Sequence, residues 1–385
     1  MRILVANAGS TSLKFKLFDY PDAKILAKGK VERVGDERGS IYWFENEKGE
    51  SKKDECAKAG TYKEGIDLFL NDIGGASQAD VVAFKTVLAL RHLGVHIIDE
   101  DVINDLKESM SVAPVHNSAY LGAIEAFQAL SPNAVLVGVF ETAFHLTMPL
   151  KNRVYGVPYE WYQKYGVQRM GFHGASHSYI AKKLAPFRRV ISCHLGGSSS
   201  ICAISDGKSV ENSFGLSLQA GITHVSRIGD IDPYIMPYLL KIGVPYDEII
   251  RGFEKNGGLR GISGTSGDMR DLRSGAKQGN ARAQLAIDVY TEGVKKYIGA
   301  YAAILGGLDA LCFTAGIGEN DYETREAIAQ GLEFIGIEID KEKNMRNEYE
   351  ISKENAKVHV FVIPADEETV VAESAYALVS EGDRA

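Results

Sequence analysis

Two stretches of this chain repeat one arrangement of residues: an apolar strand, a turn rich in glycine and serine, and a second apolar strand. The first spans residues 3–18 and the second begins 187 residues later, at Val190. Glycine lets a backbone approach an anion closely, and successive N–H groups and hydroxyls can surround a phosphate. A third glycine-rich turn covers residues 315–320. The repeat and the third turn together indicate a duplicated fold that closes on a nucleotide.

Length and composition favour two domains. The 385 residues exceed one ordinary core, and strands followed by helices occur twice, which is typical of an α/β fold of two similar domains with a ligand cleft between them. The net charge of −8 argues against nucleic acid as a partner. No apolar run is long enough to cross a bilayer, no signal-like segment opens the chain, and the four cysteines lack metal-ligand spacing. We therefore expect a cytoplasmic protein without membrane contact and with reduced thiols.

Hydrophobic periodicity predicts the remaining elements. Helices are expected over residues 62–73, 99–110, 119–129, 233–242, 245–255, 281–305, 321–332 and 367–380. Strands are expected over residues 24–32, 40–46, 81–90, 134–140, 334–339 and 358–364, besides those of the repeat. Residues 47–60 predict a solvated loop or the start of a helix, and residues 141–179 an interdomain region.

The first glycine-rich turn carries more polar groups than a hairpin needs. Residues 7–14 read N-A-G-S-T-S-L-K and supply an amide, three hydroxyls and an ammonium. A plain hairpin turn needs only about two to five residues with a Gly or Asn. Contact with phosphate or a metal is therefore the favoured interpretation, with a plain polar turn as the alternative. Asn7, at the end of a strand, is placed to orient Mg²⁺ or its waters.

Two imidazoles lie four residues apart in the segment G-F-H-G-A-S-H at 171–177. Such a pair on a helix can bind zinc, but no glutamate lies between His173 and His177 and no third ligand is evident. A histidine that stabilises a transferring phosphoryl group explains the segment better, because negative charge spreads over the phosphoryl oxygens in the transition state. Zinc binding is the alternative.

Two further polar segments precede predicted helices. In S-R-I-G-D-I-D-P at 226–233, Asp232 and Pro233 suit a helix N-terminus, whereas capping does not explain Arg227. The planar guanidinium of Arg227 suits a carboxylate or a phosphate. The segment S-G-D-M-R-D at 266–271 suits either a surface turn with an ion pair or a ligand contact, and the residues alone leave both open.

Taken together, these segments resemble the acetate kinase family, in the superfamily that joins sugar kinases, heat-shock chaperones and actin. The resemblance runs from end to end of the chain. Its motifs are N-A-G-S-T-S-L-K at 7–14, A-P-V-H-N at 113–117, T-A-F-H-L-T-M-P at 142–149, G-F-H-G-A-S-H at 171–177, R-I-G-D-I-D-P at 227–233, D-M-R-D at 268–271, A-G-I-G-E-N at 315–320 and D-E-E at 366–368.

The resemblance implies a duplicated, actin-like ATPase fold of the α/β class, with two domains around a nucleotide cleft. Residues 1–146 and 366–385 would form the first domain. Residues 147–365 would form the second, which would bind the nucleotide and pair in a homodimer.

The resemblance also implies the reaction: reversible transfer of the γ-phosphate of ATP to a short-chain carboxylate, giving ADP and an acyl phosphate, with Mg²⁺ or Mn²⁺ as cofactor. Asn7 and Glu367 would hold the metal. The implied catalytic residues are His173, Arg227, His116, Glu141 and Lys85. The implied acceptor-binding residues are Arg227, Lys85, Val87, Val115 and Phe172. The implied nucleotide-binding residues are Ser10, Ser12, Lys14, His194, Gly196, Gly197, Asp268, Met269, Arg270, Gly316, Ile317 and Asn320.

The chain departs from the family pattern at the acceptor end. Lys85 stands where the family has the arginine of G-H-R-V-V-H-G-G, although a gapped reading would recruit Arg91 instead. Glu141 replaces an aspartate, and Gly197 replaces the asparagine of H-L-G-N-G. Lysine cannot reproduce the bidentate contacts of arginine. Three hypotheses follow: an acetate kinase with a reshaped acceptor pocket, a kinase for a different carboxylate, and a nucleotide-binding homologue with little kinase activity.

Overall fold

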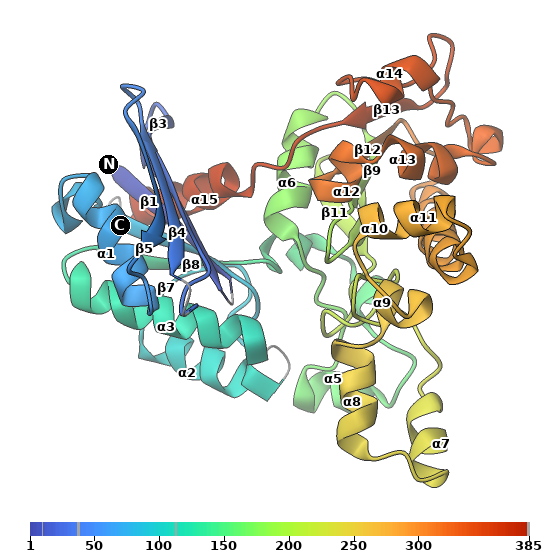
Figure 1. Cartoon of the computed structure of the whole chain (residues 1–385), viewed down its shortest axis with the longest axis horizontal. Coiled ribbons are helices and arrows are strands. Elements are labelled where there is room, and N and C mark those ends of the chain that lie inside the picture. The colour runs from blue at the N-terminus through green and yellow to red at the C-terminus, as the bar shows by residue number, and fades with distance from the viewer. Residues whose placement is uncertain (10, 37–38, 112–113, 383–385) are drawn as a thin grey trace. The chain divides into compact units, whose positions relative to one another are not determined.

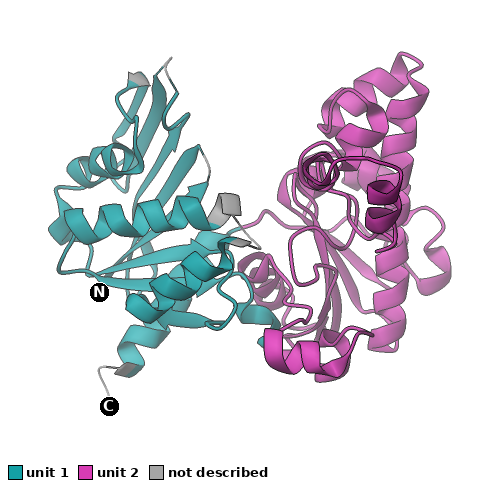
Figure 2. Cartoon of the chain, turned by 90° about the horizontal axis from the view of Figure 1, so that it is seen from below, with its two compact units in different colours: residues 1–146, 366–385 teal, residues 147–365 magenta. Residues whose placement is uncertain are grey.

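The computed structural model describes residues 1–9, 11–36, 39–111 and 114–382, and leaves the side chains of residues 56, 111 and 114–116 outside the description. The chain divides into two compact units (Figure 2). Unit 1 comprises residues 1–146 and 366–385, and unit 2 comprises residues 147–365. Each unit has its own sheet, covered by its own helices.

Unit 1 is built on an eight-stranded sheet with the strand order β5-β4-β3-β2-β1-β6-β8-β7. Strands β1 to β5 pair antiparallel in chain order, β6 and β8 run parallel to β1, and β7 is antiparallel to β8. In β2, Leu13, Phe15 and Leu17 are buried while Lys14 between them is exposed, the alternation expected of a strand. The strands are β1 (Arg2–Gly9), β2 (Ser12–Asp19), β3 (Lys24–Glu32), β4 (Ser40–Asn46), β5 (Ser51–Ala57), β6 (Val81–Thr86), β7 (Val95–Ile97) and β8 (Val135–Phe140).

Local capping sets where the helices of unit 1 begin. Thr61 and Glu64 form a reciprocal capping box at the start of α1, and the Asp99 carboxylate accepts the Val102 N–H at the start of α2. The last helix, α15, returns to unit 1 and packs against β1, β6 and β8, and Figure 1 shows it (red) beside β1 (blue). The helices are α1 (Tyr62–Asp72), α2 (Glu100–Glu108), α3 (Pro114–Leu130) and α15 (Glu367–Gly382), with the 3₁₀ turns η1 (Ala76–Gln78), η2 (Ser109–Ser111) and η3 (Ala143–Thr147), the last of which ends at the first residue of unit 2.

Unit 2 repeats the central part of the first sheet. Its five strands have the order β11-β10-β9-β12-β13, with β9, β10 and β11 antiparallel and β12 and β13 parallel to β9. The strands β3-β2-β1-β6-β8 of unit 1 have the same order and the same directions. The duplicated α/β fold predicted from the two repeats is therefore confirmed. The strands are β9 (Arg189–His194), β10 (Ser200–Ser205), β11 (Lys208–Asn212), β12 (Ala310–Thr314) and β13 (His359–Val362).

The long helix α11 organises the core of unit 2. It starts where the Asn280 side chain accepts two backbone N–H groups and ends at Gly306, which adopts the left-handed conformation that glycine favours. It packs against β9, β10, α9, α10 and α13. The helices are α4 (Leu150–Arg153), α5 (Tyr159–Tyr165), α6 (Gly174–Lys183), α7 (Ile235–Lys241), α8 (Tyr246–Glu254), α9 (Gly258–Ser263), α10 (Met269–Lys277), α11 (Ala281–Leu305), α12 (Ala315–Asn320), α13 (Tyr322–Ala329) and α14 (Lys341–Met345), with the 3₁₀ turn η4 (Glu333–Ile335).

The structure corrects five predictions. Residues 315–320, expected as a turn, form the short helix α12, and the helix expected to begin at Pro233 with Asp232 as its N-cap begins at Ile235, after Tyr234. Residues 51–57, expected in a loop or a helix start, form β5, because the edge of β4 supplies a hydrogen-bonding partner that periodicity cannot reveal. The strand expected over residues 81–90 ends at Thr86, although Leu88 and Ala89 remain buried. Residues 334–339 form no strand: η4 ends at Gly336 in the left-handed region.

The region of residues 141–179, expected to lie between domains, contains α4, α5 and the start of α6. Within the described residues, no helix has the length and apolar character needed to cross a membrane.

Candidate active site

Unit 2 contains a cavity of about 760 Å³, a volume typical of small-ligand sites. Eight residues predicted to bind a nucleotide line it: Gly196, Gly197, Asp268, Met269, Arg270, Gly316, Ile317 and Asn320. Five lining residues were not predicted: Val225, Arg273, Asp321, Tyr322 and Glu323. Four segments that are separate in the sequence therefore meet at one cavity.

Backbone hydrogen bonds join the second glycine-rich turn to the short helix α12 at this cavity. The N–H groups of Ile317 and Gly318 both donate to the Leu195 carbonyl, at 2.8 and 3.1 Å. Ala315, which opens α12, has a φ of 64°, a conformation that non-glycine residues rarely adopt. Gly258 is required nearby: it has a positive φ, and a Cβ atom there would lie 2.3 Å from the His224 carbonyl oxygen.

Asp268 begins α10 and accepts the backbone N–H of Arg270 at 2.9 Å. The Arg270 guanidinium, which is largely exposed, also pairs with the Asp268 carboxylate at 2.6 Å. This hydrogen bond holds the pKa of Asp268 below its usual value. The geometry is thus compatible with both a surface turn with an ion pair and a ligand contact, since Asp268 and Arg270 form the ion pair and also line the cavity.

Arg273 was not predicted as a cavity residue, although its spacing from Met269 indicates that position. It lies four residues after Met269, so both occupy one face of α10. Its guanidinium pairs with Asp321 at 3.1 Å and with Glu323 at 3.2 Å, which ties α10 to the start of α13. Asp321, Tyr322 and Glu323 reach the cavity through the contact between these helices, and Val225 reaches it from a loop whose Val225 N–H donates to the Gly197 carbonyl at 3.2 Å.

His173 and His194 stack beside the second glycine-rich turn, with ring centroids 3.9 Å apart. His173 has a φ of 58°, a strained conformation that often accompanies function. Its Nδ1 lies 2.9 Å from Ser200 Oγ, and His194 Nδ1 lies 2.8 Å from Ser176 Oγ. Phe172, expected in an acceptor pocket, is 1% exposed and contacts Phe214 edge to face.

The zinc alternative finds no support in the contacts of His177. Both of its ring nitrogens bond serine hydroxyls, Nδ1 to Ser192 at 2.9 Å and Nε2 to Ser200 at 2.8 Å. In the part of the chain that the structure describes, no group of three or more His, Cys, Asp or Glu side chains is arranged to hold a metal.

Arg227 is a partly buried cation beside the same turn. Its guanidinium donates to Ser198 Oγ, and no carboxylate among the described residues forms an ion pair with it. Burial lowers the pKa of Arg227 to about 10. Burial and the neighbouring Arg227 charge lower the pKa of His224 to about 3, so His224 is neutral. The turn therefore offers positive charge at a place suited to an anion.

Unit 1 contains a buried cluster of one lysine and two glutamates. Lys85 Nζ lies 2.9 Å from Glu141 and 2.7 Å from Glu367. Burial alone would lower the pKa of Lys85, but the two carboxylates outweigh it and raise that pKa well above its ordinary value. Lys85 is at the end of β6, Glu141 follows β8, and Glu367 begins α15, so the sheet brings the three together.

The alternative Arg91 is exposed and pairs with Glu108 on α2.

The first glycine-rich turn also belongs to unit 1. Asn7 and Lys14 are direct partners across β1 and β2, so they share one face of the sheet. Lys14 is exposed, while Asn7 and Ser12 are half-buried. Asn7 and Glu367 offer amide and carboxylate oxygens, the donor types that Mg²⁺ prefers, so their chemistry fits a magnesium site. Val87 is buried; Ser10 and the side chains of Val115 and His116 lie outside the described residues.

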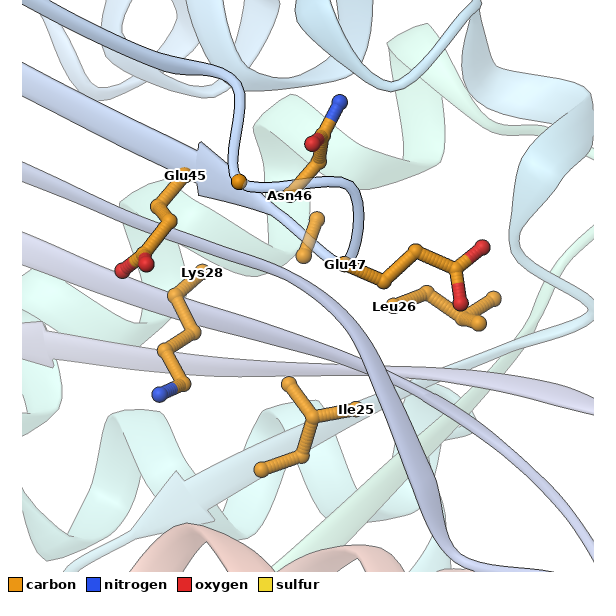
Figure 3. A pocket seen from close by; sticks show the side chains of 8 residues that line it. Ile25, Leu26, Lys28, Glu45, Asn46 and Glu47 are labelled. Carbon is orange, nitrogen blue, oxygen red and sulfur yellow. The ribbon is translucent and has the colours of Figure 1, made fainter.

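A smaller cavity of about 270 Å³ lies at the hairpin of β3 and β4 (Figure 3). Ile25, Leu26, Lys28 and Glu45 are among its lining residues. No residue predicted to act in binding or catalysis lines it.

The duplicated α/β fold and the glycine-walled cavity define a kinase with the actin-like ATPase fold. The family model described as "Acetokinase family" matches residues 2–373. The acetate kinase of Treponema denticola is 43% identical, with 98% of this chain and 100% of that protein covered. The chain therefore belongs to the acetokinase family.

Solved structures agree with this assignment. The acetate kinase of Porphyromonas gingivalis gives a TM-score of 0.86 at 35% identity, covering 98% of this chain and 99% of the other. A propionate kinase from Francisella tularensis gives a TM-score of 0.88 at 33% identity, covering 97% and 98%. The prediction of a kinase from this family is confirmed, and phosphoryl transfer to a short-chain carboxylate is the activity that the family supports.

Proposed function

We propose that this protein catalyses the reversible, Mg²⁺-dependent transfer of the ATP γ-phosphate to a short-chain carboxylate, with an acyl phosphate as product. The observation that carries the proposal is Arg227, a partly buried cation without a carboxylate partner among the described residues, beside a glycine-lined cavity. The desolvation that lowers its pKa opposes folding, which is reasonable where an anionic substrate supplies the missing charge.

The cavity residues of unit 2 are proposed to bind the nucleotide. Met269, Ile317 and Val225 give it apolar walls suited to a base, while Gly196 and Gly197 leave backbone exposed for phosphates. The Asn320 side chain donates to the Gly316 carbonyl at 2.9 Å, which stabilises the short helix α12. Ser10, Ser12 and Lys14 are proposed to contact the phosphates as well.

In the proposed reaction, a carboxylate oxygen attacks the γ-phosphorus, the bond from that phosphorus to the β–γ bridging oxygen breaks, and ADP leaves with the electron pair. Arg227 holds the carboxylate, and His173 donates to an oxygen of the transferring group, with His116 in a similar role. Lys85 and Glu141 of unit 1 are proposed to act in catalysis as well. Mg²⁺, held by Asn7 and Glu367, would neutralise phosphate charge and orient the leaving group.

The ion contacts of Lys85 favour a second candidate, a kinase for a different carboxylate. Lys85 stands where the family has an arginine and already pairs with two glutamates, so it cannot hold an acceptor carboxylate with the two parallel bonds of that arginine. Hydroxamate trapping of the acyl phosphate, run with ADP release over C1 to C6 carboxylates, tests both candidates. Preference for acetate supports the first, preference for another acid supports the second, and ATP binding without turnover contradicts both.

A homodimer is proposed on the exposed apolar face of α7 and the start of α8. Tyr234, Tyr238, Ile242 and Tyr246 are each more than half exposed there. Contiguous apolar surface of this kind is rare on monomers. A cytoplasmic location is also proposed, since the buried Cys193, Cys202 and Cys312 are free thiols.

A further inference from the structure

A chain of hydrogen bonds runs from His173 into the core of unit 2. Ser200 Oγ lies 2.9 Å from His173 Nδ1 and 2.8 Å from His177 Nε2. His177 Nδ1 in turn lies 2.9 Å from Ser192 Oγ. Ser192, His177 and Ser200 are all completely buried, so bulk solvent does not reach their side chains.

Each hydroxyl in this chain has one proton, so the direction of one bond determines the direction of the next. Among the described residues, Ser192 Oγ has one hydrogen-bond partner, His177 Nδ1. If Ser192 accepted this bond, its own O–H would be buried without an acceptor, which is costly. Ser192 therefore donates to His177.

The remaining protons follow from this first bond. With Nδ1 accepting, neutral His177 carries its proton on Nε2 and donates it to Ser200. Ser200 then has its own proton left to donate to His173 Nδ1. Neutral His173 must accordingly carry its proton on Nε2, the ring nitrogen that does not bond Ser200.

The proton position of His194 follows from the same argument. Its Nδ1 bonds Ser176 Oγ at 2.8 Å, and Ser176 is completely buried with no other hydrogen-bond partner among the described residues. Ser176 therefore donates, and the His194 proton lies on Nε2. Since the two rings stack at 3.9 Å, two positive charges there would repel each other, so the two rings are not both protonated at once.

We propose that Ser192, His177 and Ser200 are positioning residues that hold His173 as a neutral imidazole with its proton on Nε2. In this form His173 is a hydrogen-bond donor that needs no positive charge, suited to an oxygen of the transferring phosphoryl group. This role in transfer rests on the proposed function, but the tautomer itself does not.

Two-dimensional ¹H–¹⁵N NMR of histidine-labelled protein without substrates measures the tautomer directly, with His173→Gln used to assign the signal. We expect the Nε2–H tautomer of His173 near neutral pH, and a mixture of tautomers in Ser200→Ala and in Ser192→Ala. A His173 that is protonated on Nδ1, or on both nitrogens, in the unmodified protein overturns the proposal.

Kinetics provide the second readout. Ser200→Ala should lower kcat about tenfold, less than the roughly hundredfold expected when a transition-state donor is deleted, with KM for ATP unchanged. Ser205→Ala, the same substitution on the same strand, is the matched control and should change neither tautomer nor kcat. A Ser200→Ala enzyme with mixed tautomers and unchanged kcat would refute the catalytic part. If the tautomer holds but no carboxylate is phosphorylated, the proposed function fails and the hydrogen-bond chain stands.

Discussion

Replacing Arg227 with methionine should make the protein more stable and abolish its activity. Burial lowers the pKa of Arg227 to about 10, and no carboxylate among the described residues compensates its charge. Lowering the pKa of Arg227 from its ordinary 12.5 to about 10 corresponds to about 3 kcal/mol of destabilisation, at about 1.36 kcal/mol per pKa unit. Because the side chain is only partly buried, solvent screening reduces the expected gain to about 1–2 kcal/mol. For a unit of this size the melting temperature should rise by about 4 °C.

Thermal unfolding of the ligand-free protein and steady-state kinetics test this expectation together. The Tm of Arg227→Met should exceed that of the parent, while kcat/KM for the carboxylate falls at least about a thousandfold, or about 4 kcal/mol. The carboxylate substrate should stabilise the parent but not the variant. A variant with a lower Tm, or with half of the parent activity, would refute the reasoning.

Arg325 provides the contrast, because burial also lowers its pKa to about 10. Its guanidinium, however, donates to the buried acceptors of Gly318 and Asn344 and also to the exposed Asn347. Arg325→Met should therefore destabilise the protein by about 2–4 kcal/mol, since it leaves those acceptors unsatisfied. Arg188→Met, at an exposed ion pair with Asp206, should leave the Tm unchanged within about 1 °C and is the neutral control.

Three further predictions concern the acceptor end, the pH profile and the assembly. The effects of Lys85→Arg and Glu141→Asp on kcat/KM should be non-additive, because the two side chains are 2.9 Å apart. If the pocket suits an acid other than acetate, the double variant should not raise acetate turnover tenfold. Arg227 keeps its charge below its pKa and loses it above, so kcat/KM for the carboxylate should fall as the pH rises through about 10. Lys85 remains protonated at that pH. A fall in kcat/KM that begins below pH 8 as the pH rises would contradict this expectation. Tyr238→Asp should convert a dimer to a monomer of 42.0 kDa in sedimentation, and a dimer that persists would locate the interface elsewhere.

Local sequence determined much of this protein. The repeat at Ile3 and Val190 predicted the duplicated sheets, since a strand, a turn and a second strand are specified by neighbouring residues. The motifs at 268–270 and 315–320 predicted cavity-lining residues through the family resemblance, whereas the backbone itself does not require glycine at Gly316, where an added Cβ would meet open space. The helix predicted from Asp99 does begin there, with Asp99 as its N-cap, whereas the helix predicted from Pro233 begins two residues later, at Ile235.

Other features depended on the tertiary structure. β5 forms because β4 offers it an edge, and Thr86 ends β6 because later residues bond side chains of other elements, as the Leu88 carbonyl does with Asn117. The hydrogen-bond chain behind His173 joins three segments, so no window of sequence contains it. Sequence specifies what each segment can form, whereas pairing and burial between distant segments decide which group a side chain meets and therefore which proton it holds.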